Sequence, residues 1–197
     1  MRNDRDSKDS EIAELQRQLE TAHRKISMLG ARVNEDELLG VLNRRGLEQE
    51  IDKAIQFGNR YGVIASLIYA DLDDFKLVND RFGHDIGDMA LRHMVGVVQT
   101  NIRGSDLIGR IGGDEFVFLL WNATQEIAQN KASMLSAVLQ RKPVIVGNTP
   151  LSLTFSCGVA ELRKDDTPTT ALARADQAMY FAKNTRKQAD VEIARCG

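Results

Sequence analysis

Apolar residues recur through the first 33 positions of the chain at alternating spacings of three and four. The series comprises Ile12, Leu15, Leu19, Ala22, Ile26, Leu29 and Val33. With Ile12 as heptad position a, β-branched residues occupy most a positions and leucine most d positions, which favours a parallel two-stranded coiled coil. About three heptads make only a marginal helix alone, so the alternative is an amphipathic helix packed on its own domain. We expect residues 1–35 to form a coiled-coil dimerisation helix.

Beyond Asn34 the pattern becomes that of a globular domain. Residues 63–70 form a continuous apolar run, which is typical of a buried central strand. Strict alternation over 151–159 predicts a half-buried strand. Periodicity and turn residues predict the other elements, with helices over 45–60, 75–82, 88–102, 124–140 and 167–187 and strands over 107–111 and 116–120.

This order of elements predicts an α+β fold. We expect an α/β sandwich in which a mostly antiparallel central sheet is flanked by helices. The domain should cover residues 36–190, with a short C-terminal tail over 191–197.

Composition excludes several classes of partner. The chain has 197 residues and a formal net charge of −2, which gives no electrostatic footprint for nucleic acid or for an anionic membrane. Two cysteines form neither a disulfide framework nor a metal motif, and no apolar run approaches the roughly 18 residues of a membrane span. No signal peptide is evident. We therefore expect a cytoplasmic protein without a nucleic-acid or membrane partner.

Acidic residues stand at the ends of two predicted strands. Asp71 follows the buried run, and Asp114 and Glu115 lie at the Gly112-Gly113 turn. If the two strands are neighbours, their carboxylates converge as Mg²⁺ requires, with phosphates supplying its other ligands. Each feature alone is commonplace, because such turns are ordinary in hairpins and a strand-ending aspartate is often a cap. Their combination predicts phosphoryl-transfer chemistry, in which glycines admit a phosphate and Lys76 contacts it.

The motifs around these acids resemble the GGDEF domain family, the diguanylate cyclases. The name-giving motif is intact at residues 112–116, and the likeness extends over about 36–188. It is carried by "DELLGVLNRRGL" at 36–47, "DLDDFKLVND" at 71–80, "FGHDIGD" at 82–88, "SCGVA" at 156–160 and "ADQAMYFAK" at 175–183.

The resemblance implies a fold like that of nucleotidyl cyclases and polymerase palm domains. It also implies a reaction that joins two GTP molecules into cyclic di-GMP and releases two pyrophosphates. Because each domain holds one GTP, two domains must face each other in antiparallel fashion. The expected cofactor is Mg²⁺, with Mn²⁺ as an alternative, and the expected partner is a second copy of the chain bound through the N-terminal coil.

The resemblance also implies roles at the metal and the phosphates. Asp71 and Asp114 would bind the ion through their side chains and Leu72 through its carbonyl group. Glu115 would either assist with the metal or deprotonate the attacking hydroxyl. The phosphates would be bound by the Phe75 amide, by the Gly112-Gly113 turn and by Lys76, Lys183 and Lys187.

Two further residues are implied to recognise the base. Asn79 and Asp88 would read guanine, whose N1–H and N2–H₂ groups are donors that a carboxylate accepts, whereas adenine would leave these acceptors unpaired. The competing interpretation makes Asp88 the N-cap of the helix that follows; both roles can coexist.

A second site is implied upstream of the hairpin. Arg103 and Asp106 match the family's R-x-x-D inhibitory site, at which cyclic di-GMP binds, although the pattern alone also fits a helix end followed by a turn. The chain departs from the family at Leu39, where threonine is usual, at Arg186, where glycine is usual, and at Lys187, where arginine is usual. Lysine keeps the charge but lacks the bidentate fork, which predicts altered phosphate binding.

Two other functions compete with the cyclase. One is a non-catalytic GGDEF domain that binds GTP or cyclic di-GMP as an effector, although such domains usually lose the hairpin acids that are intact here. The other is a coiled-coil adaptor with an inert globular part, which leaves the site residues unexplained. In the cyclase interpretation, residues 34–40 are expected to form a hinge between a parallel coil and antiparallel catalytic domains.

Overall fold

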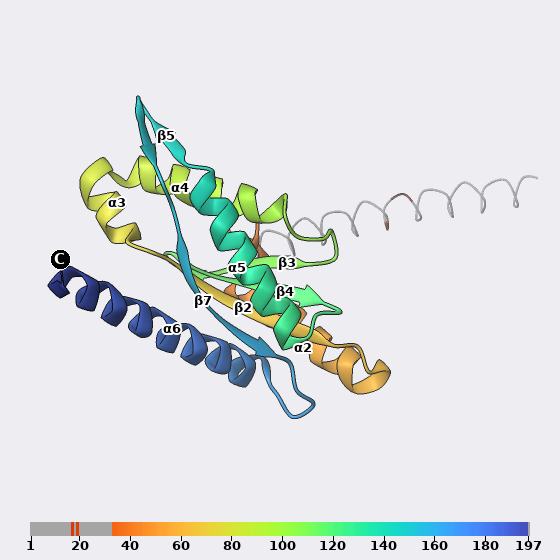
Figure 1. The fold of residues 1–197 in the computed structure, drawn as a ribbon. Helices are drawn as coiled ribbons and strands as arrows, with labels where there is room; N and C mark the ends of the chain where they lie inside the picture. The colour runs from red at the N-terminus through yellow and green to blue at the C-terminus, as the bar shows by residue number, and fades with distance from the viewer. Residues whose placement is uncertain (1–16, 18, 20–32, 197) are drawn as a thin grey trace, which may run out of the picture.

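The structure is a computed structural model that describes residues 17, 19 and 33–196, with side chains of the last helix described up to residue 185 (Figure 1). Most of the predicted coiled coil over residues 1–35 therefore lies outside the described residues. Within the described part, no helix is both long enough and apolar enough to cross a membrane.

A five-stranded sheet forms the centre of the domain, in the order β1-β3-β4-β2-β7. Only the β1–β3 pair is parallel among these neighbours. The predicted α+β sandwich with a mostly antiparallel sheet is thus confirmed. The strands are β1 (Leu42–Asn43), β2 (Ala65–Leu72), β3 (Leu107–Gly112), β4 (Glu115–Trp121) and β7 (Phe155–Glu161).

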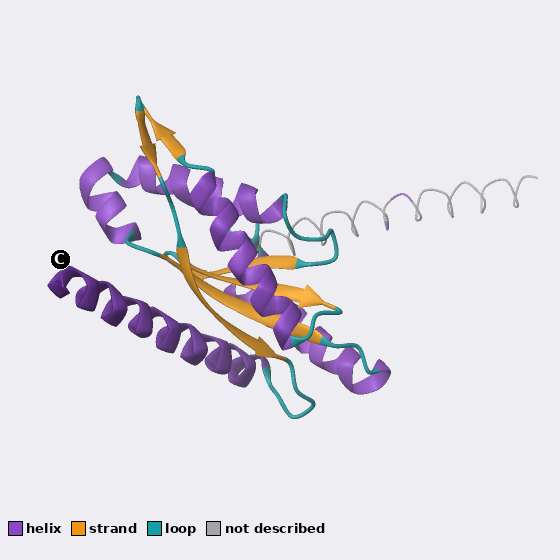
Figure 2. Cartoon of the chain, viewed as in Figure 1, coloured by secondary structure: helices purple, strands orange, loops and turns teal. Residues whose placement is uncertain are grey.

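Helices cover both faces of this sheet (Figure 2). One buried apolar cluster joins α2 and α6 to one face, and a second joins α4 and α5 to the other. The strand β2 is buried on both sides because it lies between β4 and β7 and contributes to both clusters. The helices are α2 (Arg44–Tyr61), α3 (Phe75–Phe82), α4 (His84–Gln99), α5 (Gln125–Arg141) and α6 (Pro168–Cys196).

The prediction of one half-buried strand over 151–159 is wrong in two respects. The segment divides into β6 (Thr149–Leu151), which pairs with β5 (Val144–Val146) in a small separate hairpin, and β7. In addition, β7 is covered on both faces rather than half-buried, because α6 packs over Gly158 and Ala160. The alternating apolar residues indicated only the face of β7 that packs against the cluster with α4 and α5. They did not reveal that the small residues Gly158 and Ala160 accept α6 on the opposite face.

Two helix boundaries also differ from expectation. The helix α4 begins at His84 rather than Asp88, and its N-cap is Gly83, so Asp88 lies inside the helix and is no cap. The helix α6 continues to Cys196, so residues 191–196 extend this helix and do not form a separate tail. The start of α4 has no side-chain cap, because its N-cap residue is a glycine.

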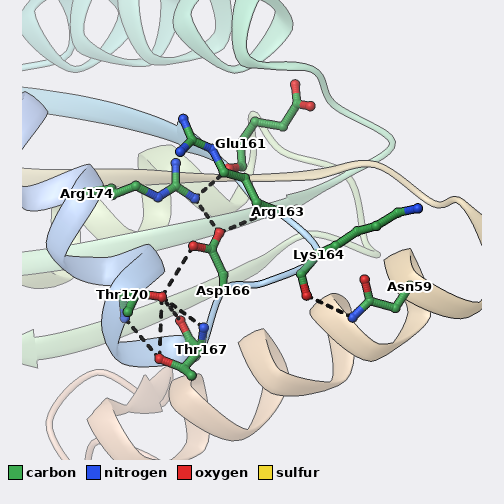
Figure 3. A network of polar contacts seen from close by, with 8 residues as sticks. All are labelled: Asn59, Glu161, Arg163, Lys164, Asp166, Thr167, Thr170 and Arg174. Atoms are coloured by element: carbon green, nitrogen blue, oxygen red, sulfur yellow. Dashed lines mark hydrogen bonds and ion pairs between the residues drawn. The ribbon is translucent and has the colours of Figure 1, made fainter.

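The loop that leads into α6 is held by a polar network (Figure 3). The Asp166 carboxylate forms an ion pair with Arg174 and accepts a hydrogen bond from the Thr170 hydroxyl at 3.3 Å. The Asn59 amide donates to the carbonyl group of Lys164 at 3.1 Å, which joins this loop to α2. These contacts fix the start of the helix that carries Lys183 near its middle.

Within residues 34–40, expected as a hinge, residues 36–40 form a hydrogen-bonded turn. The Asp36 carboxylate accepts from the amides of Leu38 and Leu39 at 3.1 and 3.0 Å. The Gly40 amide donates to the Asp36 carbonyl group at 2.9 Å. The Asp36 carboxylate and carbonyl group thus accept hydrogen bonds from backbone amides that, in a flexible linker, would be bonded only to water.

Gly158 sets the distance between β7 and α6. A Cβ atom at this position would lie 2.0 Å from the Met179 nitrogen and 2.3 Å from the Ala175 oxygen, both backbone atoms of α6. We expect Gly158→Ala to lower the free energy of unfolding by about 2 kcal/mol, because overpacking displaces the helix. Chemical denaturation measures this change.

The matched control is Gly96→Ala in α4, where a Cβ atom would meet nothing within 4 Å. Because alanine is the better helix former, this variant should be as stable as the parent or more stable, by up to about 1 kcal/mol. Equal stability of the two variants would contradict the close approach at Gly158.

Candidate active site at the hairpin

The pairing of β2 with β4 brings three acidic residues together. Asp71 lies opposite Glu115 in the register of the two strands, and directly paired residues share one face of a sheet. The Leu72 amide donates to the Asp114 carbonyl group at 3.2 Å. The carboxylates of both segments therefore meet at one end of the sheet, as the sequence predicts.

Burial and mutual repulsion act on these carboxylates. Burial raises the pKa of Asp114, and the charge of Asp71 raises it further, while Lys183 and Arg110 oppose the increase. Burial also raises the pKa of Glu115; a hydrogen bond from the Tyr69 hydroxyl opposes this, and Asp71, Asp176 and Asp114 add to it. A site in which ionised carboxylates are destabilised favours the binding of a cation.

Lys183 supplies part of that positive charge in this structure. Its ammonium group forms an ion pair with the Asp71 carboxylate. Burial alone would lower the pKa of Lys183, but the hydrogen bond to Asp71 and the charges of Asp71, Asp73 and Asp114 outweigh it, so the pKa is raised. The residue expected at the phosphates thus lies within reach of the acids. Lys187 lies where side chains are not described.

The N-terminus of α3 faces the same region. Asp74 precedes this helix in the left-handed conformation with φ 55°, and no side chain caps the first turn. Uncapped amides at a helix N-terminus form a binding site for an anion such as phosphate. Phe75 contributes the first of these positions, and the exposed Lys76 follows it. This geometry suits the phosphate roles that the resemblance implies for both residues.

The two expected guanine-reading residues come from adjacent helices. The Asn79 side-chain oxygen is buried and has no hydrogen-bond partner in the described part of the chain. A Cβ atom on Gly87 would lie 1.9 Å from it, so this amide packs directly against α4 beside Asp88. An unpaired buried oxygen costs free energy, which makes it a candidate for contact with a ligand.

The turn between β3 and β4 is tight. Gly112 pairs with Glu115, so Gly113 and Asp114 form the two-residue turn, and Gly113 has φ 49°. Glycine adopts this conformation without the penalty that a side chain brings. The glycine at 113 therefore lets the chain turn directly before Asp114, which stands at the tip beside Asp71.

The expected inhibitory residues stand apart from this cluster. The Asp106 carboxylate is nearly buried and accepts from the amides of Arg103 and Trp121 at 3.0 and 3.1 Å, so it caps the turn before β3. The Arg103 side chain is exposed. Both residues line a pocket of about 280 Å³ that also touches Val41 and Leu42.

Sequence reasoning missed two residues that shape the site. The Asp73 carboxylate accepts from the hydroxyls of Thr154 and Ser156 at 2.7 and 2.6 Å and thereby ties the end of β2 to β7. Arg110 binds the carbonyl group of Gly113 and the carboxylate of Asp36. The motif "DLDD" contained Asp73, but only the strand register shows which acids face each other.

The acids suit a magnesium ion that takes some of its ligands from water and substrate better than a metal ion that is bound by protein side chains alone. In the described ranges, no group of three or more His, Cys, Asp or Glu side chains is arranged to hold a metal. Mg²⁺ typically uses one or two carboxylates and takes its other ligands from water and substrate phosphates. Asp71, Asp114 and the Leu72 carbonyl group are donors of that kind, and the uncapped N-terminus of α3 follows them in the chain.

Comparison with known proteins agrees with this geometry. The family model for "Diguanylate cyclase, GGDEF domain" matches residues 33–189. The chain is 34% identical over 148 residues to the diguanylate cyclase DgcP of Pseudomonas aeruginosa and 36% identical over 159 residues to the response regulator PleD of Caulobacter vibrioides. These alignments cover 75% and 79% of the chain but only 22% and 35% of the relatives.

Solved GGDEF domain structures share the fold. The coiled coil and GGDEF domain of DgcB from Caulobacter crescentus, solved in complex with c-di-GMP, superposes with a TM-score of 0.79 at 22% identity. The match covers 90% of this chain and 94% of that one. Because the family model spans most of the chain and the central sheet carries the acids as described, the chain belongs to the GGDEF domain family.

Proposed function

We propose that this chain is a diguanylate cyclase that condenses two GTP molecules into cyclic di-GMP and releases two pyrophosphates. The observation that carries the proposal is the convergence of Asp71, Asp114 and Glu115 at one end of the sheet, next to the uncapped N-terminus of α3. This arrangement offers carboxylates for a metal and amides for phosphates within one region. Both are needed to move a phosphoryl group.

Asp71, Asp114 and the Leu72 carbonyl group would hold the divalent ion, Mg²⁺ or alternatively Mn²⁺. When bound, the ion neutralises charge on the phosphates and polarises the α-phosphorus. Lys183 now pairs with Asp71, and its ammonium group is near enough to transfer that contact to a phosphate when GTP arrives. Lys76 and the Phe75 amide then bind the remaining phosphate oxygens.

In the reaction, the 3′-oxygen of one GTP forms a bond to the α-phosphorus of the other. The bond between that phosphorus and the bridging oxygen breaks, and pyrophosphate leaves with its electron pair. The proton of the attacking hydroxyl passes to a base or to water. Glu115 would either accept this proton or assist the metal, and repetition on the second pair of groups closes the ring.

Guanine selection follows from the two helices beside the phosphates. The Asp88 carboxylate has no hydrogen-bond partner among the described side chains, and the nearby Asn79 amide contains an unpaired oxygen. Guanine donors at N1 and N2 would satisfy a carboxylate, whereas adenine presents an acceptor at N1. A base that leaves buried polar groups unpaired is rejected.

One domain holds one GTP, so the reaction needs a second copy of the chain. The heptad pattern before the domain supports a homodimer through the N-terminal helix. DgcB, whose solved structure contains a coiled coil beside its GGDEF domain, is in keeping with that arrangement. Linkage through a coil raises the effective concentration of one active site near the other.

The competing proposal is a non-catalytic domain that binds GTP or cyclic di-GMP as an effector. It predicts binding without turnover. The intact hairpin acids favour the enzyme, because a purely binding domain has no need to hold three carboxylates together where burial, and then the charge of Asp71, raises the pKa of Asp114.

We also propose that the product inhibits the enzyme at a second site. Arg103 is exposed at the edge of a pocket of about 280 Å³, and an arginine can bind a phosphate or a guanine edge with two parallel hydrogen bonds. Asp106 is committed to the backbone amides of Arg103 and Trp121. Its contribution is therefore to hold the Arg103 turn in place.

The protein incubated with GTP and Mg²⁺ should form cyclic di-GMP, identified by its mass. Asp114→Asn removes a metal-binding charge while keeping the shape of the turn, and should lower the turnover number by roughly 100-fold or more. The exposed Asp165, changed to Asn, is the matched control and should leave turnover unchanged. Binding of GTP by the parent protein without any product would favour the effector instead.

Arg103→Ala should relieve inhibition by the product. In the parent protein, the rate should fall as cyclic di-GMP accumulates; the variant should need roughly tenfold more product for the same inhibition, because one bidentate contact is lost. Initial rates with added cyclic di-GMP measure this effect. Arg92→Ala, at another exposed arginine, should be inhibited like the parent. Unchanged inhibition in Arg103→Ala would remove the second site.

A further inference from the structure

Two aspartates stand directly before α3, yet no side chain caps its first turn. Asp74 occupies the N-cap position with φ 55° and makes no side-chain hydrogen bond to the helix, and Asp73 precedes it. Aspartate is among the preferred residues at a helix start, because its carboxylate accepts hydrogen bonds from the free amides of the first turn. The open N-terminus of α3 therefore needs a physical cause.

Elsewhere in the chain, an aspartate binds the amides that follow it. In the turn at residues 36–40, the Asp36 carboxylate accepts from the amides two and three residues further along, at 3.1 and 3.0 Å. Such contacts are common for aspartate, whose short side chain reaches the backbone downstream of it. The same spacing from Asp73 leads to the amides of Phe75 and Lys76, the first two residues of α3.

The Asp73 carboxylate is directed toward β7 instead. The Ser156 hydroxyl donates to its Oδ1 atom at 2.6 Å, and the Thr154 hydroxyl donates to its Oδ2 atom at 2.7 Å. The Asp73 backbone amide also donates to the Thr154 carbonyl group at 2.9 Å. Each carboxylate oxygen thus has a hydroxyl donor from the segment that begins β7, and hydrogen bonds to a charged group are stronger than neutral ones.

The pairing of β2 with β7 brings these hydroxyls to Asp73. Asp71 pairs with Ser156 and Leu72 with Phe155, so the next residue of each segment continues the register. Side chains two positions apart on a strand lie on the same face of the sheet. The two hydroxyls therefore reach the carboxylate from one face, and only 7% of the Ser156 side chain is exposed to solvent that could replace it.

We propose that Thr154 and Ser156 are positioning residues that hold the Asp73 carboxylate away from α3 and so keep the N-terminus of this helix open for a phosphate. Without the two hydroxyls, the carboxylate turns to the amides that follow it, where the positive end of the helix dipole attracts it. It then occupies the amides that a phosphate needs. This inference rests on the phosphate role that the proposed function gives to α3.

The double variant Thr154→Val, Ser156→Ala removes both hydroxyls while a β-branched side chain remains at 154. Amides in the first turn of a helix exchange rapidly unless they are capped. In the ligand-free protein, hydrogen exchange at residues 75–77, measured by mass spectrometry, should therefore become about fivefold slower than in the parent. The affinity for a non-hydrolysable GTP analogue with Mg²⁺, measured by calorimetry, should fall about fivefold, because an internal carboxylate competes with the phosphate.

An Asp73→Ala background distinguishes this competition from a loosened fold. With no carboxylate at 73, removal of the two hydroxyls should change neither the exchange at 75–77 nor the affinity for the analogue. A merely structural role of the hydroxyls predicts faster exchange at 75–77 and an effect that persists in Asp73→Ala. Either of these results, or parental exchange in the double variant, would overturn the proposal.

Two further variants secure the comparison. Thr154→Val alone keeps the buried Ser156 hydrogen bond, so it should fold like the parent and show a smaller change in the same direction. The matched control is Ser133→Ala in α5, whose exposed hydroxyl donates to the Gln129 carbonyl group at 3.1 Å. This control should leave exchange at 75–77 and the affinity for the analogue unchanged.

Failure of the proposed function has a different signature. If the parent protein does not bind the GTP analogue with Mg²⁺, the phosphate role of α3 is wrong, whatever the exchange data show. If the parent binds the analogue and the double variant matches it in both affinity and exchange, only the role of the two hydroxyls is wrong.

Discussion

Repulsion among carboxylates at one end of the sheet is the constraint on which the site depends. The antiparallel pairing of β2 and β4 places Asp71 opposite Glu115 and brings Asp114 within hydrogen-bonding distance of β2 through its carbonyl group. Burial and the neighbouring charge raise the pKa of Asp114. Such an arrangement persists only if cations are supplied, from the protein or from solution.

The rest of the fold supplies those cations from elements that are distant in the chain. The helix α6 brings Lys183 to Asp71, and it can do so because Gly158 lets its backbone lie close against β7. The strand β3 brings Arg110 beneath the turn. Both contacts depend on the backbone geometry of packed elements, so a change far from the acids can alter the charge that they experience.

Sequence patterns predicted the acids, the turn and most elements, because a buried strand and a glycine hairpin have strong local signals. They did not predict the β5–β6 hairpin, since its strands are three residues each and contain no periodicity. They placed Asp88 at a helix start because Gly83 is a weak cap, and α4 begins there instead. Long-range contacts such as Arg110 with Asp36 follow from the folded register and have no local signature.

The central claim is that Asp71 and Asp114 share one divalent ion. The most direct test is a crystal of the protein grown with Mn²⁺ and a non-hydrolysable GTP analogue, with the metal located by anomalous scattering. We predict a single strong peak contacted by both carboxylates, the Leu72 carbonyl group and the nucleotide phosphates, with Lys183 moved from Asp71 to a phosphate. A metal peak that touches neither carboxylate, with nucleotide bound, would contradict the account.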